Sequence, residues 1–164
     1  RGFKSIEDVM KAYEAQQDFF MEKFINMANT TFAGHAFTFP TITASCFSAG
    51  CIEKGKMLQQ KGSDHHYTTI SIASIANIID SFAAMEECVF NKHYLTMGEL
   101  LDLMDTNFEG KEEMRQLLIN KAPKFGNNIE QADKYGEWFT ESIDRSMKRF
   151  KDAYGGPWTS HSSI

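Results

Sequence analysis

Thiols are the most reactive side chains in this sequence, and there are three of them, Cys46, Cys51 and Cys88. Three is an odd number and no CxxC pair occurs, so the pattern does not predict a disulfide framework and is typical of a reducing compartment. Cys46 and Cys51 lie five residues apart, a poor spacing for sharing one metal ion on a helix face. We therefore predict no metal site here and expect Cys46 and Cys88 to be small apolar core residues.

Two adjacent imidazoles, His65 and His66, stand in a polar stretch at residues 63–71. Two interpretations are open: the rings line a pocket and hydrogen-bond a polar or aromatic substrate, or they belong to a solvated loop. Side chains of neighbouring residues point apart on a helix or a strand, so this pair is poorly placed to bind one metal ion. His65 and His66 are therefore candidate substrate-binding residues, and no residue is a candidate metal ligand.

Glu86 and Glu87 form a pair of adjacent carboxylates inside a predicted helix. One of them could act as an acid or a base if burial raised its pKa, and an exposed helix face is the alternative. A di-metal helical protein would need a Glu-x-x-His pair, which this sequence does not contain. The mixed charges at residues 144–152 predict a solvated helix face.

The composition is that of an ordinary globular protein, with 42% hydrophobic and 24% charged residues in a chain of 164. The formal net charge of −5 gives no electrostatic reason to expect nucleic acid or an anionic membrane as a partner. No apolar run approaches the roughly 20 residues that cross a bilayer. We expect a cytoplasmic protein, and the start at Arg1 rather than Met leads us to expect a processed product or an excised piece.

The elements that must position these side chains are predicted to be mostly α, because helix signals dominate the chain. Capping boxes stand at residues 5–8 and 96–99, and apolar residues recur with a 3.6-residue period after each. Gly62 is expected to end a helix in the left-handed conformation. Strands are expected only at residues 67–70 and in the tail after Pro157. The predicted helices cover residues 5 to about 27, about 41–60, 74–90, 96–107, a short stretch after 110, and 129–154.

The predicted helix at residues 74–90 is apolar nearly all round, with isoleucine, phenylalanine and methionine on every face. A helix of this kind normally lies inside a larger body than five neighbouring helices supply. The pattern therefore predicts that this chain packs within a larger protein.

Five blocks of sequence carry a family resemblance, and they occur in a fixed order. They are residues 3–8 (FKSIED), 40–41 with 51–56 (PT, CIEKGK), 75–84 (IANIIDSFAA), 94–99 with 107–110 (YLTMGE, NFEG), and 122–127 (APKFGN). Residues 154–156 (YGG) continue them. In this order and at this spacing the blocks resemble an internal part of the large subunit of glycyl radical enzymes of the pyruvate formate-lyase type.

The resemblance implies a fold, a chemistry and a set of partners. The fold is a ten-stranded α/β barrel in a chain several times longer, and residues 1–164 would supply helices that wrap it. A glycyl radical takes hydrogen from a cysteine, and the resulting thiyl radical starts C–C, C–N, C–O or C–S cleavage of a small organic substrate. An activase with S-adenosylmethionine and an iron–sulfur cluster installs the radical. The family also implies anaerobic metabolism, while a homo-oligomeric state is left open.

The sequence departs from the family pattern in three places. The glycyl radical loop and the cysteine loop are both absent, so we expect no catalytic residue and no bound cofactor within residues 1–164, and no activity of this piece alone. Gly50-Cys51-Ile52-Glu53 imitates the cysteine loop, but Lys54-Gly55-Lys56 follows it where the family has proline, so we expect a structural Cys51. Residues 62–71 replace a glycine-rich stretch near the pocket, which favours a lyase or decarboxylase of an unusual, aromatic substrate over formate-lyase itself.

A different class of function also fits these observations. A stand-alone helical binding or interaction domain could share this ancestry without its catalysis. It would require a gene that begins near Arg1 and ends near Ile164.

Overall fold

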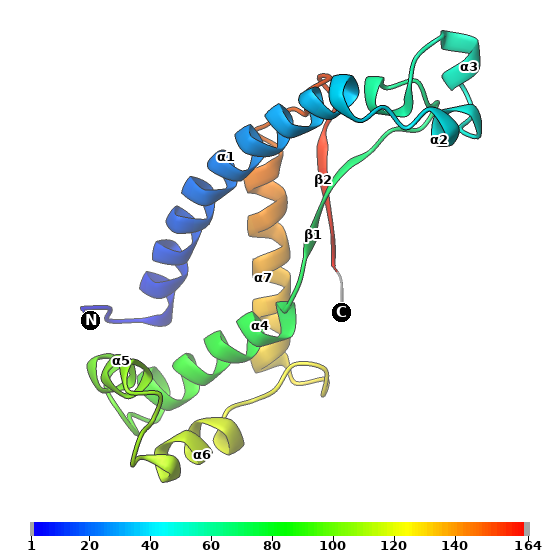
Figure 1. The fold of residues 1–164 in the computed structure, drawn as a ribbon. Helices are drawn as coiled ribbons and strands as arrows, with labels where there is room; N and C mark the ends of the chain where they lie inside the picture. The colour runs from blue at the N-terminus through cyan, green and yellow to red at the C-terminus, as the bar shows by residue number, and fades with distance from the viewer. Residues whose placement is uncertain (1, 163–164) are drawn as a thin grey trace. The chain divides into compact units, whose positions relative to one another are not determined.

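The computed structural model describes residues 2–162, and well over half of them are helical, which confirms the mostly α prediction (Figure 1). The chain forms two compact units. Of the described residues, unit 1 comprises 2–16, 73–142 and 162, and unit 2 comprises 17–72 and 143–161. Two helices, α1 (Ile6–Thr38) and α7 (Glu130–Met147), contribute residues to both units.

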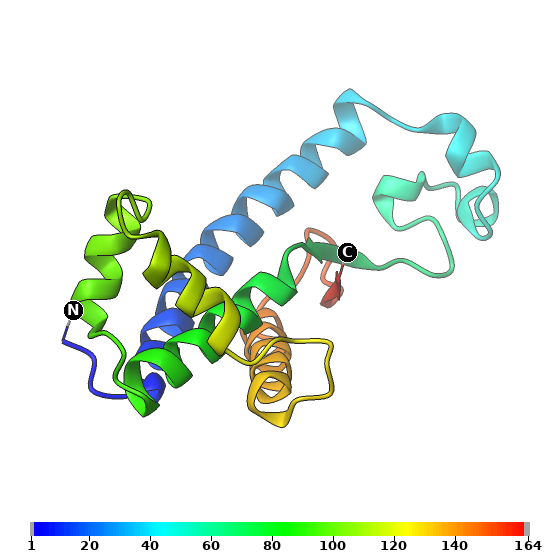
Figure 2. The same ribbon diagram turned by 90° about the horizontal axis from the view of Figure 1, so that it is seen from below.

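Unit 1 is helical. It contains the start of α1, then α4 (Ile75–Ala84), the π-helix η2 (Met85–Asn91), α5 (Met97–Asp105), α6 (Glu112–Lys121) and the first part of α7. Because η2 continues α4 without a break, the predicted helix at residues 74–90 is confirmed as one helical rod. α6 packs back against both α4 and η2 (Figure 2).

The second capping box of the sequence forms as predicted at the start of α5. The Glu99 N–H donates to Thr96 Oγ1 at 3.2 Å, and the Thr96 N–H donates to the Glu99 carboxylate at 2.7 Å. Each side chain satisfies a backbone donor that the helix leaves free, and this fixes where α5 begins.

Aromatic and aliphatic side chains fill the core of unit 1. Ile79 is fully buried, and the ring of Phe82 contacts Tyr13 (centroids 5.6 Å apart), Trp138 (4.8 Å) and Tyr135 (5.7 Å). A second buried cluster lies around Cys88, where η2, α5 and the end of α6 meet. These contacts hold α4 and α7 together, and they stabilise the unit mainly through removal of apolar surface from water.

Unit 2 differs from the prediction in its first half. The prediction of a single helix at about residues 41–60 is wrong. The chain forms three short helices there, α2 (Ile42–Cys46), α3 (Cys51–Lys54) and η1 (Leu58–Gln60). Gly50 (φ 87°) and Gly55 (φ 60°) adopt the left-handed conformation and interrupt the helix. Gly62 is not the left-handed stop; Lys61 takes that conformation instead (φ 59°).

The two longest helices have different ends from those predicted. α1 continues past its predicted end to Thr38. In this added stretch the hydroxyls of Thr30, Thr31 and Thr38 each donate to the carbonyl four residues earlier, an arrangement in which a helix accommodates these side chains. α7 stops at Met147 instead of residue 154. The chain after it forms a loop around Asp152.

Both expected strands are present. β1 (Thr68–Ile72) and β2 (Trp158–Ser162) pair in a two-stranded sheet and run in the same direction (Figure 1). The Thr159 hydroxyl donates to the Thr68 carbonyl at 3.4 Å. Within residues 2–162, no helix has the length and apolar character required to cross a membrane.

Candidate functional site

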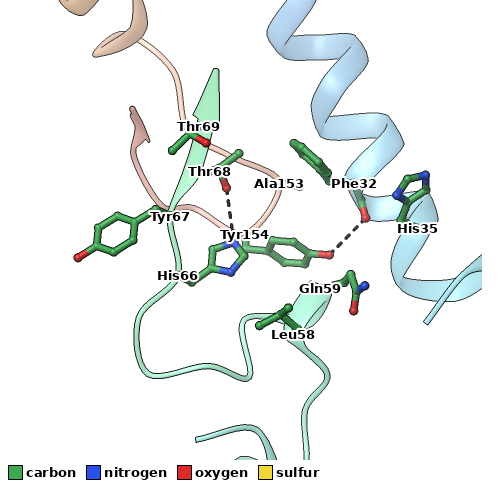
Figure 3. Close-up of a pocket in the computed structure, with 10 residues that line it drawn as sticks. All are labelled: Phe32, His35, Leu58, Gln59, His66, Tyr67, Thr68, Thr69, Ala153 and Tyr154. Atoms are coloured by element: carbon green, nitrogen blue, oxygen red, sulfur yellow. Dashed lines mark hydrogen bonds between the residues drawn. The ribbon is translucent and has the colours of Figure 1, made fainter. Parts of the chain in front are cut away.

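A cavity of about 350 Å³ opens in unit 2 beside the start of β1 (Figure 3). Four segments that are distant in sequence form its walls: the second half of α1, η1, the approach to β1 and the loop after α7. Its lining is mostly aromatic and polar and comes from Phe32, His35, Leu58, Gln59, His66, Tyr67, Thr68, Thr69, Ala153 and Tyr154. The volume is within the range of small-molecule sites.

His66 is half-buried and lines this cavity. Its ring meets the ring of Tyr154 edge to face, with centroids 6.2 Å apart, and Nε2 lies 3.4 Å from Thr68 Oγ1 (Figure 3). The Tyr154 hydroxyl donates to the Phe32 carbonyl at 3.5 Å. Burial, and then the charge of Asp152, raise the pKa of Tyr154, so its hydroxyl stays protonated at neutral pH.

His65 is exposed and does not line the cavity. Its carbonyl accepts a hydrogen bond from Ser63 Oγ at 2.9 Å. The structure therefore separates the two candidate histidines, as expected for neighbours in an extended segment. Their role in substrate binding stays a prediction, with His66 the better placed of the two.

Asp152 fixes the loop that forms one wall of the cavity, and the sequence analysis missed it. Its carboxylate is 2% exposed and accepts hydrogen bonds from the Thr68 hydroxyl (2.9 Å) and from the N–H groups of Tyr154 (2.9 Å) and Gly156 (2.7 Å). Lys61 Nζ lies 3.7 Å away. Burial alone would raise the pKa of Asp152, but these hydrogen bonds and the ammonium group outweigh it, and the pKa is lowered. Residues 144–152 are therefore not simply a solvated helix face.

Cys51 is buried at the first position of α3, with 3% of its surface exposed. It packs against Gly62, where an added Cβ would lie 2.9 Å from the Cys51 sulfur. This burial fits the structural role that we predict for it. Cys88 is also buried, as expected, and burial raises the pKa of its thiol. Cys46 is exposed, so the prediction that it is a core residue is wrong.

The adjacent carboxylates of η2 are engaged in ion pairs. Glu86 lies 2.7 Å from Lys134 Nζ, and Glu87 lies 3.8 Å from Lys92 Nζ. Neither lines the cavity beside β1. This pairing favours a structural role for both carboxylates over acid or base catalysis. In the part of the chain that the structure describes, no three His, Cys, Asp or Glu side chains gather as a metal ion would require.

Comparison with known proteins identifies the class. A family model described as "Pyruvate formate lyase-like" matches residues 1–164. The chain is 34% identical over 136 residues to a trans-4-hydroxy-L-proline dehydratase of Clostridioides difficile, and 30% identical over 160 residues to an isethionate sulfite-lyase of Bilophila wadsworthia. The chain therefore belongs to the pyruvate formate lyase-like family of glycyl radical enzymes, which confirms the resemblance carried by the five blocks.

The fold agrees with this assignment. The chain superposes on the glycerol-bound, B12-independent glycerol dehydratase from Clostridium butyricum with a TM-score of 0.86 and 31% sequence identity, over 97% of its own length. It spans only a small part of these proteins: 17% of the hydroxyproline dehydratase, 18% of the sulfite-lyase and 20% of the glycerol dehydratase chain.

Proposed function

We propose that residues 1–164 are an internal segment of a glycyl radical lyase or dehydratase, in which they supply helices around a barrel and part of the pocket wall. The observation that carries this proposal is the agreement in both sequence and backbone along nearly the whole chain. β1 and β2 would then be two strands of the barrel. The cysteine loop and the glycyl radical loop would lie outside these residues.

The radical chemistry would come from those two loops. The glycyl radical, installed by an S-adenosylmethionine-dependent iron–sulfur activase, supplies a thiyl radical that can remove a hydrogen atom from an unactivated carbon, which acid–base side chains cannot do. Residues 1–164 would act by shaping and closing the pocket. The burial of Cys51 supports a radical cysteine outside residues 1–164, because a thiyl radical must contact the substrate.

The names of the relatives narrow the reaction class. Two are dehydratases and one is a sulfite-lyase, so each name describes elimination of a group from a small polar molecule. We therefore favour C–O or C–S cleavage of a small hydroxylated or sulfonated substrate. The replacement of a glycine-rich stretch by residues 62–71 is consistent with a pocket that differs from that of formate-lyase.

The test uses the full-length enzyme, activated under anaerobic conditions by its activase with S-adenosylmethionine. The activated enzyme is offered glycerol, propane-1,2-diol, trans-4-hydroxy-L-proline and isethionate, with pyruvate and coenzyme A as the comparison. We expect elimination of water or sulfite from a member of the first group. Formate release from pyruvate, with all four other compounds untouched, would overturn the assigned reaction class.

A further inference from the structure

Unit 1 carries an apolar groove of about 870 Å³ that the proposed function does not use. Its apolar lining, which we call the floor, comes from Ile75, Ala76 and Ile79 of α4 together with Phe125. The side chain of Phe125 is 43% exposed, which is unusual for a phenylalanine that is already beside a core.

Gly136 of α7 completes the floor. An added Cβ at this position would lie 3.1 Å from Cδ1 of the fully buried Ile79, so glycine allows α7 to lie close to α4. Because glycine has no side chain, it also leaves the groove open along the helix. The groove is thus a surface that backbone or side chains of another segment can enter.

The acidic part of the groove's lining, which we call the rim, comes from α7. Asp133, Glu137 and Glu141 of α7 line it at intervals of four residues, which places them on one face of the helix, about 6 Å apart along its axis. Within residues 2–162, none of the three forms an ion pair; the nearby cations Lys134 and Lys124 pair with Glu86 (2.7 Å) and Asp80 (3.8 Å) instead. Like charges at this spacing destabilise an isolated helix. Arg145 lies four residues after Glu141 in the same helix, so it is beside Asp133 and Glu137 that the row favours a further cationic neighbour.

We propose that this groove is the docking surface for a basic, apolar-faced segment of the same polypeptide outside residues 1–164. The proposal rests on the proposed function, since it requires a longer chain. The floor offers apolar contact, the rim offers three carboxylates for Lys or Arg, and about four-fifths of the length of the relatives lies outside the matched region. A second copy of this surface is disfavoured, because it would bring two acidic rims together in a chain of net charge −5.

The first experiment is zero-length carbodiimide cross-linking of the full-length enzyme without activation. Chains of natural isotopic composition are mixed with ¹⁵N-labelled chains, and cross-linked peptides are identified by mass spectrometry. We expect Asp133, Glu137 or Glu141 to be joined to a lysine outside residues 1–164, in peptides that carry a single isotope. If every cross-linked peptide joined a labelled chain to an unlabelled one, the groove would be a contact between two copies of the protein. If Asp133, Glu137 and Glu141 reacted with carbodiimide but formed no cross-links, no segment would dock in the groove. Either result overturns the proposal.

The second experiment reverses one charge. Glu137→Lys is compared with the control substitution Glu113→Lys. Glu113 is an exposed glutamate of α6 that does not line the groove. We expect Glu137→Lys to reduce the remaining cross-links at Asp133 and Glu141 by about tenfold, the factor that corresponds to 1.4 kcal/mol. Glu137→Gln should reduce the cross-links by a smaller factor. It also provides a test if the charge-reversed variant misfolds. Equal cross-linking in all three variants would contradict the proposal.

The proposed reaction class and the proposed docking surface are tested by independent experiments. Cross-linking needs no radical, no activase and no substrate, so its outcome is independent of the reaction class. An active lyase whose groove is empty would overturn only the docking inference.

Discussion

Asp152 shows what a single buried carboxylate does for this site. We predict that Asp152→Ala destabilises the loop after α7 by about 3 kcal/mol, because one buried hydroxyl and two partly buried N–H groups lose a charged acceptor. Hydrogen exchange at the amides of Tyr154 and Gly156 measures this directly and should accelerate. Asp144→Ala is the control: Asp144 is an exposed partner of Lys148, so its loss should cost less than about 1 kcal/mol. Equal acceleration in both variants would contradict this account.

The same residue predicts a pH dependence. The pKa of Asp152 is lowered in the folded state, so its stabilising effect is present above the unfolded pKa, about 3.9, and is lost as the pH falls through the folded value. The difference in unfolding free energy between the wild type and Asp152→Ala should be constant near neutral pH and shrink below about pH 4. A difference that grew on acidification would have the wrong sign.

The histidine pair gives the prediction for the pocket. If His66 holds substrate through one neutral hydrogen bond, His66→Ala should weaken binding by roughly 2- to 15-fold, corresponding to about 0.5–1.5 kcal/mol. His65 is exposed and does not line the cavity, so His65→Ala is the matched control and should leave the Michaelis constant unchanged. Michaelis constants of the activated full-length variants decide this. Unchanged kinetics in both would leave residues 63–66 as a solvated loop.

Cys51 gives the prediction for catalysis. Because its sulfur is buried against Gly62, Cys51→Ser should leave turnover of the activated full-length enzyme largely intact. The measurement is product formation together with exchange of hydrogen into substrate. Loss of that exchange in a variant that still folds would show that Cys51 carries the thiyl radical.

At the scale of elements, two glycine substitutions should have opposite effects. An added Cβ at Gly62 would lie 2.1 Å from the Lys56 carbonyl oxygen, a backbone atom that cannot move alone, so Gly62→Ala should destabilise the protein by about 3 kcal/mol. Gly34 lies in α1 with nothing within 4 Å of an added Cβ, so Gly34→Ala should stabilise by about 0.5–1 kcal/mol. The midpoint of thermal unfolding should fall in the first variant and rise in the second; a change in the same direction would contradict the structure.

Elements with local signals could be predicted from the sequence. The capping box at Thr96 and the apolar period of α4 depend on residues within a few positions, and both form as expected. The close approach at Gly50 could not be foreseen, because it involves a residue outside the local stretch: an added Cβ there would lie 2.3 Å from Asp64 Oδ1. The buried partner of Asp152 is distant as well, since Thr68, which donates to it, is 84 residues away.

At the scale of the whole molecule, the apolar surface of the chain supports its place in a larger body. Several aromatic side chains of α1 and the segment after it are largely exposed, among them Phe20, Phe37, Phe39 and Phe47. Exposed apolar residues in such number are typical of surfaces that another part of a protein covers. This observation favours an internal segment over a stand-alone binding domain.

The most direct test of the central claim is electron paramagnetic resonance of the full-length enzyme. The enzyme is incubated anaerobically with its activase and S-adenosylmethionine, then exposed to oxygen and analysed by mass spectrometry. We predict an organic radical signal that disappears on exposure to oxygen, with backbone cleavage at a glycine outside residues 1–164. An activase that is active on another glycyl radical enzyme but generates no radical here, or cleavage within residues 1–164, would contradict the account.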